Sequence, residues 1–274
     1  MSRLIVGTSG RHDVEVYYED HGEGRPVVLI HGWPLSGKSW ENQVGPLVDA
    51  GYRVVTYDRR GFGESSKPYD GYEYDTLAAD LRALLDELDL RDVTLVGFSM
   101  GGGEVARYLG TYGPDRVRSV VLAGAVTPAL WAQDGGGVDQ AGMQQMLDGV
   151  AGDRLAFLEE FFPNFFGAGG TPKVSDAVLH FAWQVASVAS PKGTADCIVA
   201  FGTTDFREDL QKVQVPILVL HGDSDGIVPF EASGRRIREF AQNVQTVVVE
   251  GAPHGFNASH PQQFNQALLA FLAK

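Results

Sequence analysis

The sequence Val93-Thr-Leu-Val-Gly-Phe-Ser-Met-Gly-Gly-Gly-Glu-Val-Ala-Arg-Tyr108 joins an apolar run to a segment with helical spacing. Residues 93–97 suit a buried strand, whereas apolar residues recur every three to four positions after 105, as in a helix packed on a sheet. Gly97-Phe-Ser-Met-Gly101 lies where strand meets helix and matches the pattern G-x-S-x-G. Its glycines are needed because the turn crowds the strand against the helix. The pattern predicts that Ser99 projects above the sheet.

A short pattern of this kind also arises by chance. A chain with 34 glycines among 274 residues should contain about 0.2 accidental matches. The alternative reading is a glycine-rich turn that only starts a helix. Because the sequence predicts both the strand before and the helix after this turn, the catalytic interpretation is favoured. The rest of the chain can then be searched for the partners of a nucleophilic serine.

Strand and helix patterns alternate on both sides of this segment. The alternation predicts an α/β fold with a mostly parallel, doubly wound sheet and an antiparallel pair at its N-terminal edge. Besides 93–97, strands are expected over residues 4–6, 14–19, 26–31, 52–57, 117–122, 215–221 and 244–250. Helices are expected over residues 40–48, 77–88, 231–242 and 264–272.

Between residues 125 and 206 the strand patterns stop, and glycines and prolines separate helical fragments. This change predicts a helical cap, residues 126–206, inserted into an α/β core formed by residues 1–125 and 207–274. Its aromatic side chains either line a substrate pocket or fill the seam between cap and core, and packing is the commoner role. They are Trp131, Phe157, Phe161, Phe162, Phe165, Phe166, Phe181 and Trp183, of which Trp131 and Phe162 are the candidates for the pocket.

Composition and charge narrow the class of protein. Hydrophobic residues make up 44% of the chain and charged residues 21%, as in ordinary globular domains. A net charge of -13 disfavours nucleic acid and anionic membrane surfaces as partners. No signal-peptide core or membrane-spanning run is present, so a cytoplasmic protein is expected. Cys197 is the only cysteine, and we expect a buried core residue, with no disulfide, metal or cofactor.

A nucleophilic serine needs a base to accept its proton and an acid to orient that base. On this topology the expected order along the chain is serine, acid, histidine. His254 follows the last predicted strand, and Asp225 follows the strand before it. Parallel pairing therefore brings both to the edge where Ser99 stands. Asp223 lies in the same loop and competes with Asp225 for the role of the acid.

Two backbone amides are candidates for the oxyanion hole, which binds the negative oxygen of a tetrahedral intermediate. One belongs to Met100, at the start of the helix after the nucleophile, and the other to Trp33, in the loop after strand 26–31.

We expect other polar residues near the site to have structural roles. We expect His31 and His221, which end strands, to orient loops by hydrogen bonding. Asp58 and Arg59 are expected to form local hydrogen bonds or ion pairs, as charged loop residues usually do.

Five motifs occur in the order of a known family. They are His31-Gly-Trp-Pro34, Asp58-Arg-Arg-Gly-Phe-Gly-Glu-Ser65, Gly97-Phe-Ser-Met-Gly101, His221-Gly-Asp-Ser-Asp225 and Ala252-Pro-His-Gly-Phe256. With them the chain resembles the α/β-hydrolase family, and within it the cofactor-free haloperoxidase group of esterases and perhydrolases. The resemblance implies Ser99 as nucleophile, His254 as base and Asp225 rather than Asp223 as acid. It also implies that the Trp33 and Met100 amides form the oxyanion hole.

The resemblance further implies an acyl-serine intermediate that two nucleophiles can attack. Water gives a carboxylic acid, and hydrogen peroxide gives a peracid that oxidises halide without metal or haem. We expect the substrate to be a small, uncharged ester. Pro34 is the candidate for selecting the second nucleophile, because proline restricts the preceding residue to extended backbone and so fixes where the Trp33 carbonyl points.

Two other functions stay open at this point. An amide or γ-lactam hydrolase uses the same triad and differs in protonating a poorer leaving group. A non-catalytic ligand-binding protein on the hydrolase scaffold is disfavoured, because such proteins often lose a member of the triad that is complete here. The sequence is compatible with a homo-oligomer.

Overall fold

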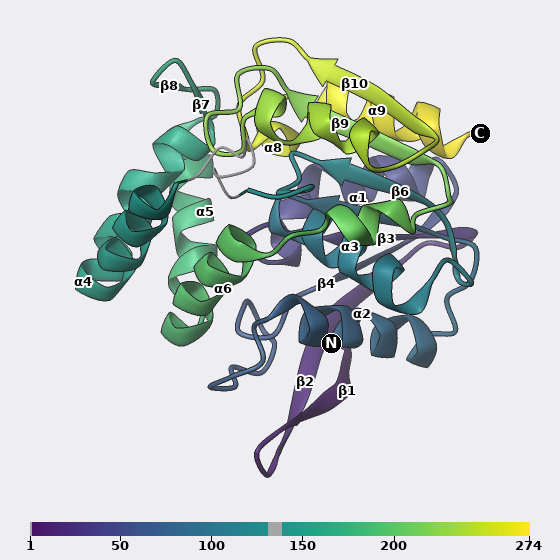
Figure 1. The fold of residues 1–274 in the computed structure, drawn as a ribbon, viewed down its shortest axis with the longest axis horizontal. Helices are drawn as coiled ribbons and strands as arrows, with labels where there is room; N and C mark the ends of the chain where they lie inside the picture. Colours follow the sequence, from purple (N-terminus) through teal and green to yellow (C-terminus); the bar gives the residue numbers. More distant parts are fainter. Residues whose placement is uncertain (1, 131–138) are drawn as a thin grey trace.

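Eight strands form one sheet in the computed structural model, which describes residues 2–130 and 139–274 (Figure 1). The three neighbours at the N-terminal edge pair antiparallel, and all later pairs are parallel. The predicted mostly parallel, doubly wound sheet with an antiparallel edge is therefore confirmed. In spatial order the strands are β1 (Ser2–Ser9), β2 (His12–His21), β4 (Tyr52–Tyr57), β3 (Arg25–Ile30), β5 (Val93–Phe98), β6 (Val117–Ala123), β9 (Ile217–Gly222) and β10 (Val244–Val249).

Helices cover both faces of this sheet. Successive side chains of a strand point to opposite faces, so Val28 and Ile30 of β3 pack on one side while Val27 and Leu29 pack on the other. The first side is covered by α2 (Tyr74–Glu87), α3 (Met100–Tyr112) and α7 (Arg207–Gln211), and the second by α1 (Glu41–Asp49) and α9 (Pro261–Leu272). Because both faces are covered, the central strands are continuous apolar runs.

The register of the parallel strands aligns the loops that carry the predicted site. Ile30 pairs with Gly97, Phe98 with Ala123, and Val249 with Gly222. The chain therefore leaves β3, β5, β9 and β10 at a common edge, which is where ligands bind in open α/β sheets.

Between β6 and β9 the described chain is mainly helical. Besides α7, the helices here are α4 (Gln140–Phe165), α5 (Asp176–Ser187) and α6 (Pro191–Thr203), and Figure 1 shows these three together beyond the end of the sheet. Asp139, Ser175 and Ser190 cap their first turns through side-chain oxygens that accept backbone N–H groups. Asp153 has non-helical backbone angles and divides α4 into two helical parts. The cap boundaries at residues 126 and 206 stay a prediction.

Two expectations about local structure are wrong. A single helix over residues 231–242 is replaced by the 3₁₀ helices η3 (Phe230–Ala232) and η4 (Gly234–Glu239), because Ser233 has non-helical angles and its hydroxyl donates to Pro229 O. The segment before β9 also contains a hairpin, β7 (Gly167–Ala168) with β8 (Thr171–Pro172). Its turn is Gly169-Gly170, with both residues at positive φ, the conformation that favours glycine in two-residue hairpins.

In residues 2–130 and 139–274, no helix combines the length and the apolarity needed to cross a lipid bilayer.

Candidate active site

Ser99 occupies a sharp turn between β5 and α3. Its backbone angles, φ 54° and ψ -119°, are unusual for a residue with a side chain. The positions of the flanking glycines, Gly97 and Gly101, leave no room for a side chain. A Cβ added at Gly97 would lie 2.4 Å from Gly101 O, and one at Gly101 would lie 2.5 Å from Ile30 O. This crowding is what the G-x-S-x-G pattern predicts for the residues around a nucleophilic serine.

His254 links Ser99 to Asp225 through two hydrogen bonds. Its Nε2 lies 2.9 Å from Ser99 Oγ, and its Nδ1 lies 2.7 Å from Asp225 Oδ2. Ser99 follows β5, Asp225 follows β9 and His254 follows β10, so the parallel register brings together three distant segments. All three side chains are buried, with exposures of 6%, 5% and 1%. This geometry lets His254 accept the serine proton while Asp225 holds the imidazole in place.

Asp225 is held as a carboxylate by its surroundings. Oδ1 accepts hydrogen bonds from the Ile227 and Val228 amides at 2.9 and 2.8 Å. Burial by itself would raise its pKa, but the charge of His254 and hydrogen bonds from His221 and His254 together hold the pKa below the ordinary value. The ionised form is therefore favoured beside His254.

Asp223, the competing acid, has other hydrogen-bond partners than the histidine. Its Oδ1 accepts hydrogen bonds from the Gly251 amide at 2.7 Å and from the Ser224 hydroxyl at 3.0 Å, both at the protein surface. The sequence places both aspartates in one loop, and their carboxylates bind different groups. Of the two, Asp225 is the one that contacts His254.

The strand-ending histidines hold loops, as expected. His221 Nε2 lies 2.8 Å from Val228 O and 3.3 Å from Asp225 Oδ2, so it holds the loop that carries Asp225 in place. His31 Nε2 accepts a hydrogen bond from the Arg59 amide at 3.0 Å. Both side chains are fully buried.

The loop after β3 approaches Ser99 closely. A Cβ added at Gly32 would lie 3.0 Å from Ser99 Cβ. The Leu35 amide donates to Gly32 O across a turn whose Trp33–Pro34 peptide is cis, as in type VI turns. Within the described chain, neither the Trp33 amide nor the Met100 amide donates to a protein acceptor. Both donors are thus available to a ligand oxygen beside Ser99.

A buried ion pair supports this loop from below. Arg59 Nε lies 2.9 Å from Glu104 Oε2, and Arg59 Nη2 donates to His31 O at 2.8 Å. Glu104 lies on α3, five residues after Ser99, and also accepts a hydrogen bond from the Tyr57 hydroxyl. The pair therefore joins the loop after β3 to α3, the helix that follows Ser99. Asp58 is also structural, since it accepts the Gly37 and Glu64 amides.

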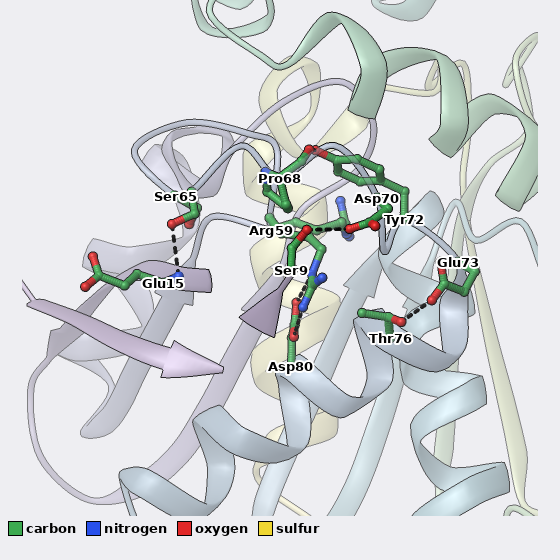
Figure 2. A network of polar contacts seen from close by, with 12 residues as sticks. Ser9, Glu15, Arg59, Ser65, Pro68, Asp70, Tyr72, Glu73, Thr76 and Asp80 are labelled. Carbon is green, nitrogen blue, oxygen red and sulfur yellow. Dashed lines mark hydrogen bonds and ion pairs between the residues drawn. The ribbon is translucent and has the colours of Figure 1, made fainter. Parts of the chain in front are cut away.

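Further polar contacts fix the segment that follows Arg59 (Figure 2). Ser9 Oγ donates to Asp70 at 2.5 Å, and the Tyr72 hydroxyl donates to Pro68 O at 2.6 Å. Asp80 on α2 accepts two hydrogen bonds from the Arg60 guanidinium, each of 2.6 Å. These contacts anchor residues 58–72 to β1 and α2, away from the reacting groups.

A small apolar cavity opens onto Ser99 and His254. Its volume is about 40 Å³, enough for a few water molecules. The other described residues that line it are Trp33, Val126, Leu130, Met146, Phe161, Phe201, Ile227 and Val228. The Trp33 indole forms one wall, held by a hydrogen bond from Nε1 to Thr194 O. Such a lining suits a short apolar acyl group and disfavours a charged one.

The candidates for the substrate pocket have different outcomes. The prediction that Phe162 lines the pocket is wrong, because its neighbour Phe161 lines the cavity instead. One position turns a helix by about 100°, and Phe162 packs among Phe165 and Phe166 with 1% exposure. Trp131 lies outside the described residues. Pro34 is buried beside Trp33 and does not line the cavity, so its role stays a prediction.

Comparisons with known proteins identify the family and agree with the fold. Residues 25–261 match the family described as alpha/beta hydrolase fold. The chain is 46% identical to a putative non-heme chloroperoxidase of Synechocystis sp., over 99% of this chain and 100% of that protein. It is 36% identical to a bifunctional esterase/perhydrolase of Acinetobacter calcoaceticus, over 94% and 96%. A crystal structure of bromoperoxidase from Bacillus anthracis superposes with a TM-score of 0.97, at 56% identity, covering 100% of this chain and 99% of that one.

Proposed function

The chain belongs to the α/β-hydrolase family, in its group of non-heme haloperoxidases and perhydrolases, and we propose that it cleaves small carboxylic esters at Ser99. It is a serine hydrolase with perhydrolase activity, as predicted. The observation that carries the proposed site is the pair of hydrogen bonds from Ser99 through His254 to Asp225 beside an apolar cavity.

In the first half of the reaction, Ser99 attacks the ester carbonyl. His254 Nε2 accepts the serine proton as the bond to carbon forms, and the Trp33 and Met100 amides donate to the oxyanion. Asp225 stabilises the imidazolium that results. His254 then gives this proton to the alcohol oxygen, the carbon–oxygen bond breaks, and the acyl group remains on Ser99.

In the second half, a small nucleophile takes the place of the alcohol. His254 removes a proton from water or hydrogen peroxide, whose oxygen attacks the acyl carbon, and the proton returns to Ser99 as the bond to the acyl group breaks. Water gives a carboxylic acid and peroxide gives a peracid. The peracid transfers its outer oxygen to a halide ion, which yields a hypohalite and the carboxylic acid.

The partition between the two nucleophiles depends on the loop that holds Trp33. Pro34 limits the backbone of this loop, and a Trp33 carbonyl directed at the site would accept a hydrogen bond from peroxide. Replacement of Pro34 by Leu should therefore lower the ratio of peracid to carboxylic acid. An unchanged ratio would remove Pro34 from the mechanism.

The proposed site is tested with p-nitrophenyl acetate, with and without peroxide, alongside an assay for halogenation by peracid. Wild type should release p-nitrophenol and, with peroxide, halogenate. The Ser99→Ala variant should do neither. Ester cleavage that survives in this variant would overturn the role of Ser99.

A further inference from the structure

Met146 is the sulfur-containing side chain among the described residues that line the cavity with Ser99 and His254. It lies in the first part of α4 and is only partly buried. The rest of the described lining is hydrocarbon and aromatic, apart from the triad groups and the Trp33 indole. A thioether is the most easily oxidised group in such a wall.

The cavity is also where the oxidant forms. A peracid released from Ser99 begins inside this space of about 40 Å³, whose wall includes Met146. We propose that the peracid formed at Ser99 oxidises Met146 to the sulfoxide, and that this modification limits the number of turnovers the enzyme completes with peroxide. The inference rests on the perhydrolase activity described above.

The chemistry is a transfer of one oxygen atom. The sulfur lone pair attacks the outer peroxy oxygen, a sulfur–oxygen bond forms, and the oxygen–oxygen bond breaks. The carboxylate that leaves takes the peroxy proton and departs as the carboxylic acid. Sulfur is oxidised, the peracid is reduced, and no other reactant is needed.

Other sulfur atoms of the described chain are placed differently. Met100 is fully buried and does not line the cavity. Met143, one turn before Met146, faces α6, where a Cβ added at Gly202 would lie 2.8 Å from its Sδ. Cys197 is fully buried, and burial raises the pKa of its thiol to about 12, which keeps it in the less reactive protonated form. Oxidation should therefore be selective for Met146.

The sulfoxide should inhibit because it is polar and has few partners. The Trp33 indole N–H already donates to Thr194 O, and the imidazole nitrogens of His254 face Asp225 and Ser99, so among the described side chains of the wall the Ser99 hydroxyl is the donor left for the new oxygen. That contact would compete with the hydrogen bond from Ser99 to His254, and the loss of apolar surface would weaken acyl binding. We expect kcat/KM for small esters to fall about tenfold.

The test follows oxidation and activity together. Wild type is incubated with p-nitrophenyl acetate and peroxide, freed of reagents, assayed for esterase activity and mapped by peptide mass spectrometry. Met146 sulfoxide should appear before Met143 or Met100 sulfoxide, in proportion to the activity lost. Treatment with methionine sulfoxide reductases should restore both the Met146 thioether and the esterase activity. Ser99→Ala with peroxide alone should leave Met146 reduced, whereas added peracetic acid should oxidise it in the same variant.

Two variants separate this effect from general damage. Met146→Leu conserves volume, and each variant is compared with its own starting activity. Met146→Leu should keep that activity through a number of peracid turnovers that inactivates wild type, while Met143→Leu should behave like wild type. Peracid formation without Met146 oxidation, or equally fast inactivation of Met146→Leu, would overturn the inference. Absence of peracid from wild type would instead overturn the perhydrolase activity, and the inference with it.

Discussion

His254 Nε2 lies 2.9 Å from Ser99 Oγ, although 155 residues separate the two in the sequence. The contact exists because β5 and β10 end at the same edge of the sheet. Replacing Ser99 or His254 by Ala should each reduce kcat about a million-fold, and the double variant should be no worse, since the two act as one unit. Steady-state kinetics of the three variants check this. Additive losses would show that the two groups act independently.

Asp225 and Asp223 form a matched pair for testing the acid. Asp225→Asn should lower kcat about ten-thousand-fold, because the amide no longer holds the imidazole in the reactive tautomer. Asp223→Asn should change kcat less than threefold, since its oxygen still accepts the Gly251 amide at the surface. A larger loss at position 223 than at 225 would reverse the assignment.

Asp225 also links stability to pH. Its pKa is below the ordinary value in the folded protein, so the ionised group stabilises the fold. This contribution is complete above the unfolded pKa of about 3.9 and is lost as the pH falls toward the lowered folded value. Between about pH 5 and pH 3, the free energy of unfolding in urea should therefore fall more for wild type than for Asp225→Asn. Parallel curves would contradict this.

Phe161 and Phe162 are adjacent on α4 but have different surroundings. Phe161→Ala should enlarge the acyl cavity and raise kcat/KM for butyrate or hexanoate esters relative to acetate. Phe162→Ala should leave this preference unchanged and lower the free energy of unfolding by about 3–5 kcal/mol, as for other buried aromatics. Kinetics on an ester series and urea unfolding distinguish the two. If only Phe162→Ala changed the chain-length preference, the assignment of Phe161 rather than Phe162 to the cavity wall would be contradicted.

Asp80 and Asp86 carry ion pairs on the same helix at different depths. The Asp80 pair with Arg60 is buried, whereas Asp86 is exposed and pairs with Arg82 and with Arg116. Arg116 keeps Asp89 as a partner when Asp86 is removed. Asp80→Ala should lower the free energy of unfolding by about 3–5 kcal/mol because Arg60 is left buried and unpaired. Asp86→Ala should change it by less than about 1 kcal/mol. Equal effects in denaturant melts would show that burial does not decide the contribution.

The sheet and the positions of Ser99, Asp225 and His254 were accessible from the sequence. Continuous apolar strands and helical periodicity define a parallel sheet, and its register then fixes which loops share an edge. The choice of Asp225 over Asp223 was not accessible from spacing, because both lie in one loop. It depended on the resemblance, and the direction of each side chain appears only in three dimensions.

Other features depend on local geometry that periodicity does not encode. The helix break at Asp153 changes which face of α4 meets the cavity. The prediction therefore missed by one residue and chose Phe162 instead of Phe161. The 3₁₀ turns around Ser233 contain residues typical of an ordinary helix. The cis Trp33–Pro34 bond has no sequence signal, because only a minority of X-Pro bonds in folded proteins are cis.

The central claim is that one acyl group on Ser99 gives both the carboxylic acid and the peracid. The ratio of these two products tests it most directly. At each of several peroxide concentrations, the initial ratio of peracetic acid to acetic acid is measured with p-nitrophenyl, phenyl and methyl acetate. Because the alcohol has left before the second nucleophile attacks, we expect one ratio for all three esters, rising in proportion to peroxide, and neither product from Ser99→Ala. A ratio that changes with the leaving alcohol would contradict a common acyl-Ser99 intermediate.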